Sequence, residues 1–319
     1  MAIIAVAGGT GQMGRAVVDA LIASGKHKTI ILSRKENPAL EKELGVPIIA
    51  VDYNNVPAVT KALEDNNVDT VISTIFMMPS FTGDLPKEVE IIRAANASKT
   101  TTKRMISSDF SFDLKPEHVA AGFPATPFKK AAEAELVASK NLESTRIMMG
   151  HFMDYWGVPG FKSHFAPMAT FIDIENNYAA IPGSGNGRVT MAHSTDVAKF
   201  IVASLDLQKW DPIHYIIGDT VTSNDLLALA EKAKGRKFTV VHDSVDDLKS
   251  GVITALPGQI AAYDFMPKQV FDMVMPILGL WFDEGAFDLE NVPTTLNDKF
   301  PEIETIKAKD MIEQAWKKS

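Results

Sequence analysis

A glycine-rich segment near the N-terminus constrains the fold of this chain more than any other feature. The apolar run Ala2–Val6 is typical of a buried strand, and apolar residues recur at helical spacing from Met13 onward. Between them lies Gly8–Gly14, with the sequence GGTGQMG. Glycine permits a tight turn and a close approach of phosphate to the backbone, and the free amides at a helix start attract phosphate. The segment predicts a dinucleotide-binding turn with six candidate contacts: Gly8, Thr10, Gly11, Gln12, Met13 and Gly14.

Two basic residues follow the second apolar strand, Thr29–Leu32. In a dinucleotide-binding fold the tip of this strand lies beside the adenosine ribose, where an acid bonds the 2′-hydroxyl and a cation accepts a 2′-phosphate. Arg34 and Lys35 occupy this tip, so the sequence favours NADP(H) over NAD(H). The alternative is that both side chains lie on a solvated loop.

The ends of three further strands supply candidates for the same sheet edge, because ligands of open α/β sheets bind at the carboxyl ends of the strands. Asp52 follows the strand Ile48–Val51 and is expected at the adenine or at the start of a helix. The strand Val71–Ile75 opens into a loop that we expect beside the nicotinamide ribose. The strand Arg104–Ser107 ends in a serine pair that bonds a ligand or serves a turn. The cofactor candidates are Asp52, Thr74, Ile75, Phe76 and Ser107, and the substrate candidates are Met78, Ser108 and Phe110.

The segment after the strand Thr145–Met149 combines an imidazole, a carboxylate, a phenol and large apolar rings. That mixture suits the wall of a ligand pocket. A histidine has a pKa suited to proton transfer, although a histidine beside a phenylalanine is also a common packing residue. Tyrosine and tryptophan more often shape a pocket than react. The candidates for substrate contact are His151, Phe152, Asp154, Tyr155 and Trp156.

The stretch Ile253–Leu280 is rich in methionine, phenylalanine and proline, including Phe265 and Met266. Flexible methionines beside aromatic rings can enclose a bulky organic ligand. A core helix or a subunit contact explains the same composition.

Composition and charge exclude several classes of function. The net charge is −8 and there is no long basic run, so the chain lacks the electrostatic footprint of a nucleic-acid or anionic-membrane binder. The chain has no cysteine, which excludes disulfides, thiolate catalysis and the common structural zinc sites. We expect no metal site, no signal peptide and no membrane span. A cytoplasmic monomer or homodimer with a small-molecule substrate is the resulting expectation.

Strands and helices alternate up to residue 149, which indicates a parallel sheet with right-handed crossovers. A chain of 319 residues can form one large α/β domain or a nucleotide domain with a smaller lobe. The order of its motifs is more specific: GGTGQMG, then SRK after the second strand, SSDF at the fifth, a helix with two lysines, a glycine turn at 182–187, and strand-helix segments at 189–198 and 215–226.

These motifs together resemble the NmrA-like and isoflavone-reductase-like family of atypical short-chain dehydrogenases/reductases, over most of the chain. The resemblance implies an α/β fold, a Rossmann-type doubly wound parallel sheet with a smaller C-terminal α+β substrate lobe, and NADP(H) as the cofactor. The NAD(P)-binding domain is then expected at 1–157, with its sheet completed by parts of 182–220. Residues 158–319 are expected to form mainly the substrate-binding lobe.

The resemblance also implies a catalytic lysine without the tyrosine of the usual Tyr-x-x-x-Lys pair. Positions 125 and 126 are Ala and Thr, so neither lysine of the pair has that tyrosine. Helical register places Lys129 on the family lysine, and a shift of one residue selects Lys130. An ammonium near the nicotinamide ribose holds the cofactor and can donate a proton, whereas a solvated helix face explains the pair without function. His151 is the third catalytic candidate, since residues after this strand approach the substrate in the family.

The leading interpretation is an NADPH-dependent reductase of an apolar, aromatic or polycyclic small molecule, with a place in secondary metabolism. A second interpretation is a non-catalytic NADP(H)-sensing regulatory protein of the NmrA type. A third is acid/base cyclisation or condensation without hydride transfer, in which NADP(H) is a structural cofactor. The missing tyrosine keeps the third interpretation open.

Overall fold

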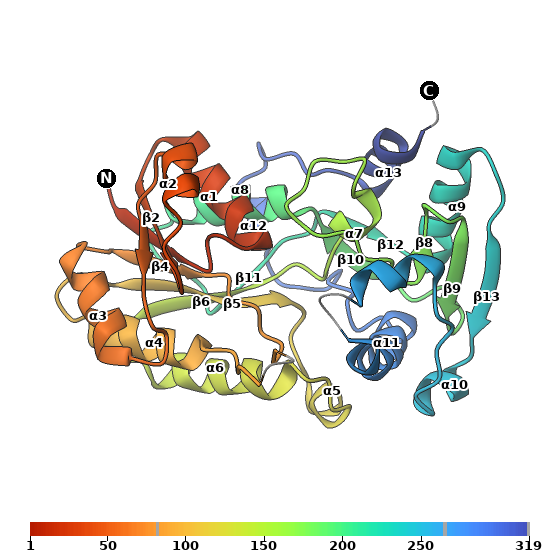
Figure 1. Ribbon diagram of the computed structural model, residues 1–319, viewed down its shortest axis with the longest axis horizontal. Helices are drawn as coiled ribbons and strands as arrows, with labels where there is room; N and C mark the ends of the chain where they lie inside the picture. Colours follow the sequence, from red (N-terminus) through yellow and green to blue (C-terminus); the bar gives the residue numbers. More distant parts are fainter. Residues whose placement is uncertain (81–82, 264–266, 318–319) are drawn as a thin grey trace. The chain divides into compact units, whose positions relative to one another are not determined.

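The computed structural model describes residues 1–80, 83–263 and 267–317, which belong to two compact units (Figure 1). The first unit comprises Met1–Phe110, Pro124–Met148 and Ala198–His214, and the second comprises Ser111–Phe123, Met149–Val197 and Tyr215–Ser319. Residues 149–157, expected in the cofactor domain, therefore lie in the second unit. No helix in the described part of the chain is long and apolar enough to cross a bilayer.

A seven-stranded parallel sheet forms the centre of the first unit, and the predicted α/β Rossmann-type fold class is confirmed. The strand order is β11-β6-β5-β4-β1-β2-β3. A segment from beyond residue 182 joins this sheet, where it forms the edge strand β11. The strands are β1 (Ile3–Ala7), β2 (Lys28–Ser33), β3 (Ile48–Ala50), β4 (Thr70–Ser73), β5 (Arg104–Ser111), β6 (Glu143–Met148) and β11 (Ile213–Tyr215).

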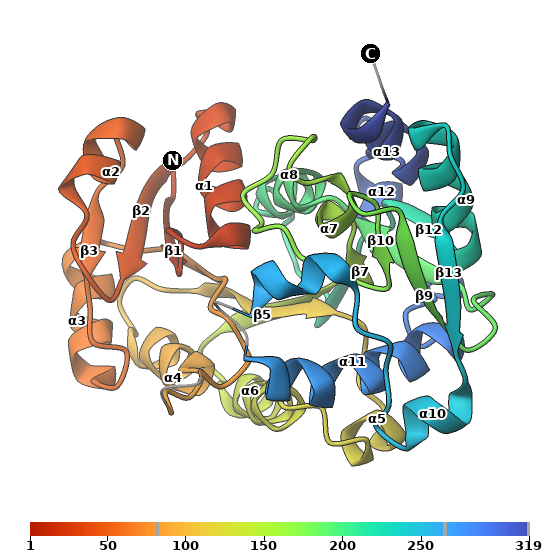
Figure 2. The same cartoon turned by 45° about the vertical axis from the view of Figure 1, so that its right-hand side comes forward.

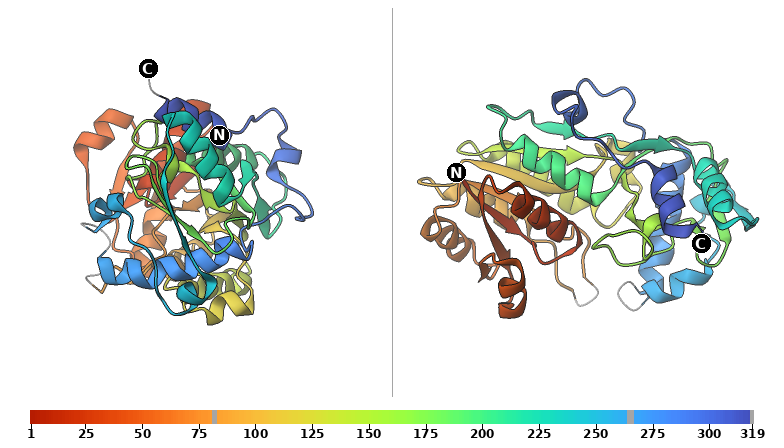
Figure 3. Two further views of the ribbon diagram at one scale, coloured as in Figure 1. Left: turned by 90° about the vertical axis from the view of Figure 1, so that its right-hand side faces the viewer. Right: turned by 90° about the horizontal axis from the view of Figure 1, so that it is seen from above.

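Helices cover both faces of this sheet, so its central strand β1 is buried along almost its whole length. In β1, the residues from Ile4 to Ala7 are all fully buried, as expected for a strand enclosed on both faces. One face carries α1 (Gln12–Ser24), α2 (Pro38–Leu44) and α8 (Ser194–Ser204), and the other carries α3 (Val56–Asp65), α4 (Glu88–Ala97) and α6 (Thr126–Ala138), as Figures 1 and 3 show.

The strand order reverses at β1, which fixes where a ligand can bind. The chain runs outward from β1 through β2 to β3 and then returns to β4 on the other side of β1. Ala7 at the end of β1 is in register with Leu32 on one side and with Ser73 on the other. Loops that leave adjacent strands in opposite directions create a crevice at their carboxyl ends. The glycine-rich turn after Ala7 lies at this point.

The second unit has two small sheets and seven helices among its described residues, and it has the predicted α+β composition (Figure 2). Helix α13 packs on α9 and α7, and α11 packs on β9 and α10. The sheets are β12-β10-β7 and β13-β9-β8, made of β7 (His151–Phe152), β8 (Ile172–Asp173), β9 (Tyr178–Pro182), β10 (Val189–Ala192), β12 (Asp219–Val221) and β13 (Thr239–Asp243). The helices are α5 (Pro116–Ala120), α7 (Asp154–Gly157), α9 (Ser223–Lys234), α10 (Val245–Lys249), α11 (Lys268–Asp283), α12 (Leu296–Lys299) and α13 (Ala308–Trp316), and Pro257–Ala262 forms a 3₁₀ helix.

The methionine-rich stretch contributes helix α11 to the core of the second unit. Phe271, Met275 and Phe282 of this helix are buried, which fits the core-helix alternative. Met273 is exposed on the opposite side. Phe265 and Met266 lie outside the described residues.

Gly14 provides a test of the packing between α1 and the turn. A Cβ atom at Gly14 would overlap the carbonyl oxygen of Gly8 and lie 2.7 Å from Cα of Gly9, and these backbone atoms cannot move without disturbing the turn. We expect Gly14→Ala to lower the free energy of unfolding by about 1–3 kcal/mol, the usual range for overpacking. Urea titration measures this change.

The matched control is Gly11→Ala in the same turn. Its Cβ would meet only the carbonyl oxygen of Gly8, at 3.3 Å, and Gly11 has an extended backbone that alanine adopts freely. This variant should unfold within about 0.5 kcal/mol of the wild type, the usual span for surface changes. Equal stability of the two variants would show that close packing at Gly14 does not hold the turn.

Candidate functional site

The glycine-rich turn has the conformation that a phosphate-binding loop requires. Gly8 has φ +76°, a conformation that favours glycine, and its amide donates to the carbonyl of Leu32 over 3.1 Å. Gly11 precedes α1, whose first turn carries no acidic residue and no capping side chain. The amides at this helix start therefore keep their partial positive charge for an anion. Of the six predicted contacts, Thr10 and Gly11 are exposed, Gly8 and Gln12 are half-buried, and Met13 and Gly14 are buried.

Tyr53 fastens this turn, and the sequence analysis missed it. Its buried hydroxyl donates to the carbonyl of Leu32 over 2.7 Å and accepts from the amide of Gly8 over 3.3 Å. Burial raises the pKa of Tyr53 well above its ordinary value, so the phenol keeps its proton for the bond to Leu32. A tyrosine directly after a strand gives no sequence signal of this role, because both partners are distant along the chain.

A cavity of about 610 Å³ lies in the first unit at the ends of β2 and β3. Arg34 and Asp52, two predicted cofactor residues, line it. Lys35 is exposed and does not line the cavity, whereas Lys87, just before α4, does. The further lining residues are Ala50, Val51, Tyr53, Asn54, Gly83, Asp84 and Leu85.

Asp52 forms a turn at the cavity wall rather than starting a helix. The backbone and side-chain nitrogens of Asn54 both donate to its Oδ1 over 2.9 Å, and these bonds lower the pKa of Asp52. Helix α3 is capped instead by Asn55, whose Oδ1 accepts from the amide of Ala58. The helix-start role expected for Asp52 is therefore wrong, and its contact with the adenine stays a prediction.

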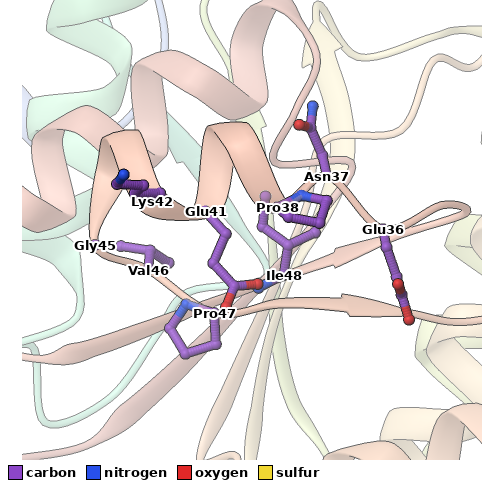
Figure 4. A pocket seen from close by; sticks show the side chains of 9 residues that line it. All are labelled: Glu36, Asn37, Pro38, Glu41, Lys42, Gly45, Val46, Pro47 and Ile48. Atoms are coloured by element: carbon purple, nitrogen blue, oxygen red, sulfur yellow. The ribbon is translucent and has the colours of Figure 1, made fainter.

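A second cavity, of about 550 Å³, is a shallow hollow between α2 and the start of β3 (Figure 4). Glu41 spans it and accepts from the amide of Ile48 over 3.0 Å. None of the predicted site residues lines this hollow. We therefore place the candidate site at the turn and the first cavity.

Hydrogen bonds hold the first residues of the loop after β4, and apolar side chains follow these residues. Thr74 donates to the carbonyl of Ala7 through both its amide (2.9 Å) and its hydroxyl (2.8 Å). The hydroxyl of Ser108 donates to the carbonyl of Ile75 over 2.8 Å. The hydroxyls of Thr74 and Ser108, predicted to contact ligands, are thus used to hold the loop. Phe76, which follows, is 68% exposed.

Glu88 is a buried acid beneath the ends of β4 and β5, and the sequence analysis missed it as well. Its carboxylate accepts from the hydroxyls of Ser73 (2.5 Å) and Ser107 (2.7 Å) and from the amide of Ser108 (2.9 Å). Burial raises the pKa of Glu88. The predicted cofactor contact of Ser107 is not supported, because its hydroxyl donates to an internal carboxylate.

An alternating chain of charges links the two candidate lysines. The ammonium of Lys129 lies 2.9 Å from Oδ1 of the buried Asp109, and Arg146 bonds Oδ2 of Asp109 over 3.1 Å. Arg146 also bonds Oε1 of Glu133 over 3.0 Å, and Lys130 bonds Oε2 of Glu133 over 2.8 Å. The side chain of Lys129 is 14% exposed and that of Lys130 is 36% exposed.

The two lysines at the ends of this charge chain have different surroundings. Successive residues of a helix point about 100° apart, so Lys129 and Lys130 of α6 cannot both face the strand. Lys129 reaches Asp109, near the carboxyl end of β5, whereas Lys130 stays with Glu133 on its own helix. Lys129 is therefore the lysine that pairs with a residue near the carboxyl end of β5.

His151 lies among aromatic rings in the second unit. Its ring centroid is 5.6 Å from that of Tyr155 and 5.2 Å from that of Phe282, and its Nε2 atom is enclosed. Burial lowers the pKa of His151 to about 3. The imidazole is thus uncharged at neutral pH, and the predicted role of His151 as a proton-donating catalyst is not supported.

The other residues predicted to contact substrate in the second unit differ in how deeply they are buried. Asp154 is fully buried and accepts from the hydroxyls of Ser163 (2.5 Å) and Ser194 (2.6 Å), so its predicted contact with substrate is not supported. Trp156 is also buried, and its Nε1 donates to the carbonyl of Thr170. These two residues hold the second unit together. Side chains that remain half-buried are Phe152 and Tyr155 here, and Met78 and Phe110 in the first unit.

Comparison with known proteins identifies the family. The model of the NmrA-like family matches residues 2–309. The chain belongs to the NmrA-like family. Oxidoreductase BOA1 of Botryotinia fuckeliana is 34% identical over 302 residues, covering 94% of this chain and 95% of that protein. Oxidoreductase swnN of Metarhizium robertsii is 31% identical over 340 residues, covering 99% and 98%. The predicted resemblance is confirmed.

Solved structures show the same fold. The binary complex of leucoanthocyanidin reductase with NADPH from Vitis vinifera superimposes with a TM-score of 0.73 and covers 98% of both chains. Only 19% of the residues are identical, so this likeness concerns the fold alone.

Asp109→Asn tests the charge chain. This change leaves Lys129 and Arg146 facing a neutral amide in a largely buried place, and breaking a buried pair usually costs about 3–5 kcal/mol. We expect the free energy of unfolding to fall by roughly 3 kcal/mol, measured by urea titration.

The matched control is Glu135→Gln, also on α6. Glu135 pairs with Arg93 over 2.8 Å, and the side chain of Arg93 is 56% exposed. An exposed pair contributes about 0–1 kcal/mol, so this variant should change little. Equal small losses in both variants would argue against a structural role for Asp109.

Glu88 should make stability depend on pH. Because burial raises its pKa above the ordinary 4.5, the folded chain keeps this proton to higher pH than the unfolded chain. The contribution of Glu88 to stability is then greatest below that ordinary value and is lost as pH rises through the folded pKa. Glutamine can accept from Ser107 and donate to Ser73 without ionising. We expect Glu88→Gln to gain stability relative to the wild type as the pH rises above 4.5 and through the raised pKa of Glu88.

The measurement is urea unfolding of both proteins at several pH values. Glu90→Gln, in the same first turn of α4, serves as the control. A stability difference between Glu88→Gln and wild type that does not change with pH would contradict a raised pKa at Glu88.

Proposed function

We propose that this chain is an NADPH-dependent reductase of an apolar, aromatic or polycyclic small molecule in secondary metabolism. The observation that carries the proposal lies within the first unit. Two features lie at the carboxyl ends of its parallel strands. One is a glycine turn followed by a helix start without a capping side chain, and the other is a lysine paired with a buried carboxylate. Ligands of such sheets bind at this edge. We further propose a cytoplasmic monomer or homodimer.

The residues of the turn and the adjoining cavity fit NADP(H). Gly11 is exposed, so the backbone at the start of α1 is open to a pyrophosphate. Arg34 lines the cavity at the tip of β2, where a guanidinium can bind the 2′-phosphate with two hydrogen bonds. The NADPH complex of a structural relative supports the same cofactor.

Lys129 supplies the polar chemistry in this proposal. NADPH, when bound, provides the hydride. The ammonium of Lys129 can hydrogen-bond a ribose hydroxyl and donate to an oxygen or nitrogen that gains negative charge. Asp109 keeps the ammonium in place, and Arg146 holds the other oxygen of Asp109. With Ala125 and Thr126 in place of a tyrosine, we assign the proton-donating role to Lys129 or to a water that it orients.

The apolar side chains of the loop after β4 support an apolar substrate. Phe76 is exposed and Met78 is half-buried, beyond a base fastened at Thr74. An exposed aromatic ring on a held loop provides a contact surface for another ring. The oxidoreductase names of two relatives support a redox reaction.

The test is oxidation of NADPH by the full chain with a panel of enones, imines and aryl ketones. With an active compound, Lys129→Met should lower kcat by about 100-fold or more, because general acid catalysis contributes about 10²–10⁴. Absorbance at the NADPH band measures the rate, and a binding titration reports the cofactor separately.

Other outcomes decide between the remaining interpretations. Loss of activity in Lys130→Met but not in Lys129→Met would move the role to the outer lysine. Tight NADPH binding without turnover of any compound would favour the NADP(H) sensor. Product formation without transfer of label from deuterated NADPH would indicate chemistry without hydride transfer.

A further inference from the structure

Lys87 brings a second cation to the cavity that Arg34 lines. The sequence placed the second cation at Lys35, which directly follows Arg34 along the chain. In the structure Lys35 is exposed and lies outside the cavity lining, whereas Lys87 belongs to it. We propose that Lys87, together with Arg34, binds the 2′-phosphate of the cofactor and determines the preference for NADP(H). This inference rests on the proposed binding of a dinucleotide at the turn.

The position of Lys87 in its helix favours an anion beside it. Lys87 directly precedes Glu88, the first residue of the ten-residue helix α4, and its side chain makes no capping bond. A cation at the positive end of a helix is electrostatically unfavourable unless an anion lies nearby. The carboxylate of Glu88 bonds Ser73 and Ser107 in the interior. The first turn also carries Glu90, so the helix start already has an acidic residue, and a phosphate in the cavity would pair chiefly with the ammonium of Lys87.

The charges that line the cavity leave both cations available to a phosphate. Asp84 lies 4.0 Å from Arg34, and both side chains are exposed, so separating this pair costs little. Asp52 accepts two bonds from Asn54, and Lys87 adds a smaller contribution to its lowered pKa. Two cations and two carboxylates line the cavity, so a phosphate must take the place of the exposed Asp84 beside Arg34. A phosphomonoester carries about −1.5 to −2 charges at neutral pH, and it would then lie against both Arg34 and Lys87.

Arg34 and Lys87 offer complementary contacts to a phosphate. A guanidinium presents a planar fork that binds two oxygens, and an ammonium acts as a compact point charge. Arg34 approaches from the end of β2, and Lys87 comes from the start of α4, more than fifty positions away along the chain. Because they come from different elements, the two charges can reach different oxygens of one phosphate.

The experiment compares ligands that differ only in the 2′-phosphate. The full chain and its variants Lys87→Met, Lys87→Arg and Lys35→Met are titrated with NADPH and NADH, and with 2′,5′-ADP and ADP as competitors. We expect Lys87→Met to weaken NADPH and 2′,5′-ADP about tenfold, the loss of one charge-assisted hydrogen bond. NADH and ADP should change less than about twofold, as should all four ligands with Lys35→Met. Lys87→Arg should retain the selectivity.

Each other result has a defined meaning. Equal weakening of NADPH and NADH by Lys87→Met would place Lys87 at another part of the dinucleotide and overturn the inference. A loss confined to 2′-phosphate ligands in Lys35→Met, but absent in Lys87→Met, would return the role to Lys35. Failure of the wild type to bind either dinucleotide would instead overturn the proposed function. Thermal unfolding confirms that each variant is folded.

Discussion

The turn after β1 is held by neighbouring strands on both sides, and the rest of the first unit depends on that clamp. Tyr53 connects it to the carbonyl of Leu32 at the end of β2. Thr74, after β4, lies against Gly8 and bonds the carbonyl of Ala7. These contacts cross the point where the strand order reverses. The backbone that would meet a phosphate is therefore fixed by the sheet before any ligand binds, which lowers the ordering cost of binding.

At the same edge of the sheet, hydroxyls and charged side chains make different internal bonds. The hydroxyls of Ser108 and Thr74 bond backbone carbonyls, and the hydroxyl of Ser107 donates to the buried Glu88. The charged groups instead form a linked chain from Lys129 through Asp109, toward the outer lysine Lys130. Burying a carboxylate with two cations avoids an isolated buried charge. The two lysines are consequently members of one network with different surroundings, which the sequence presented as alternatives.

Local patterns predicted the fold and the glycine turn, because a strand, a turn and a helix are encoded by neighbouring residues. Such patterns could not predict which of Lys129 and Lys130 faces the sheet, because adjacent residues of a helix differ only in the direction they face. Polar candidates such as Asp154 and Ser107 were assigned to ligands because the sequence does not distinguish a buried hydrogen bond from an exposed one. Tyr53 was missed because its partners are distant in the sequence.

The groups that are candidates for ligand binding are few, and they differ in their chemistry. The amides in the first turn of α1 suit a pyrophosphate, and Arg34 and Lys87 suit a further phosphate. Lys129 is the lysine that β5 holds at this edge, and Phe76 offers an apolar ring. In the proposed binding mode, the anionic part of the ligand meets these positive groups and its reactive part meets the ammonium of Lys129. This distribution favours a reaction in which the cofactor supplies the redox chemistry and the protein supplies position and a proton donor.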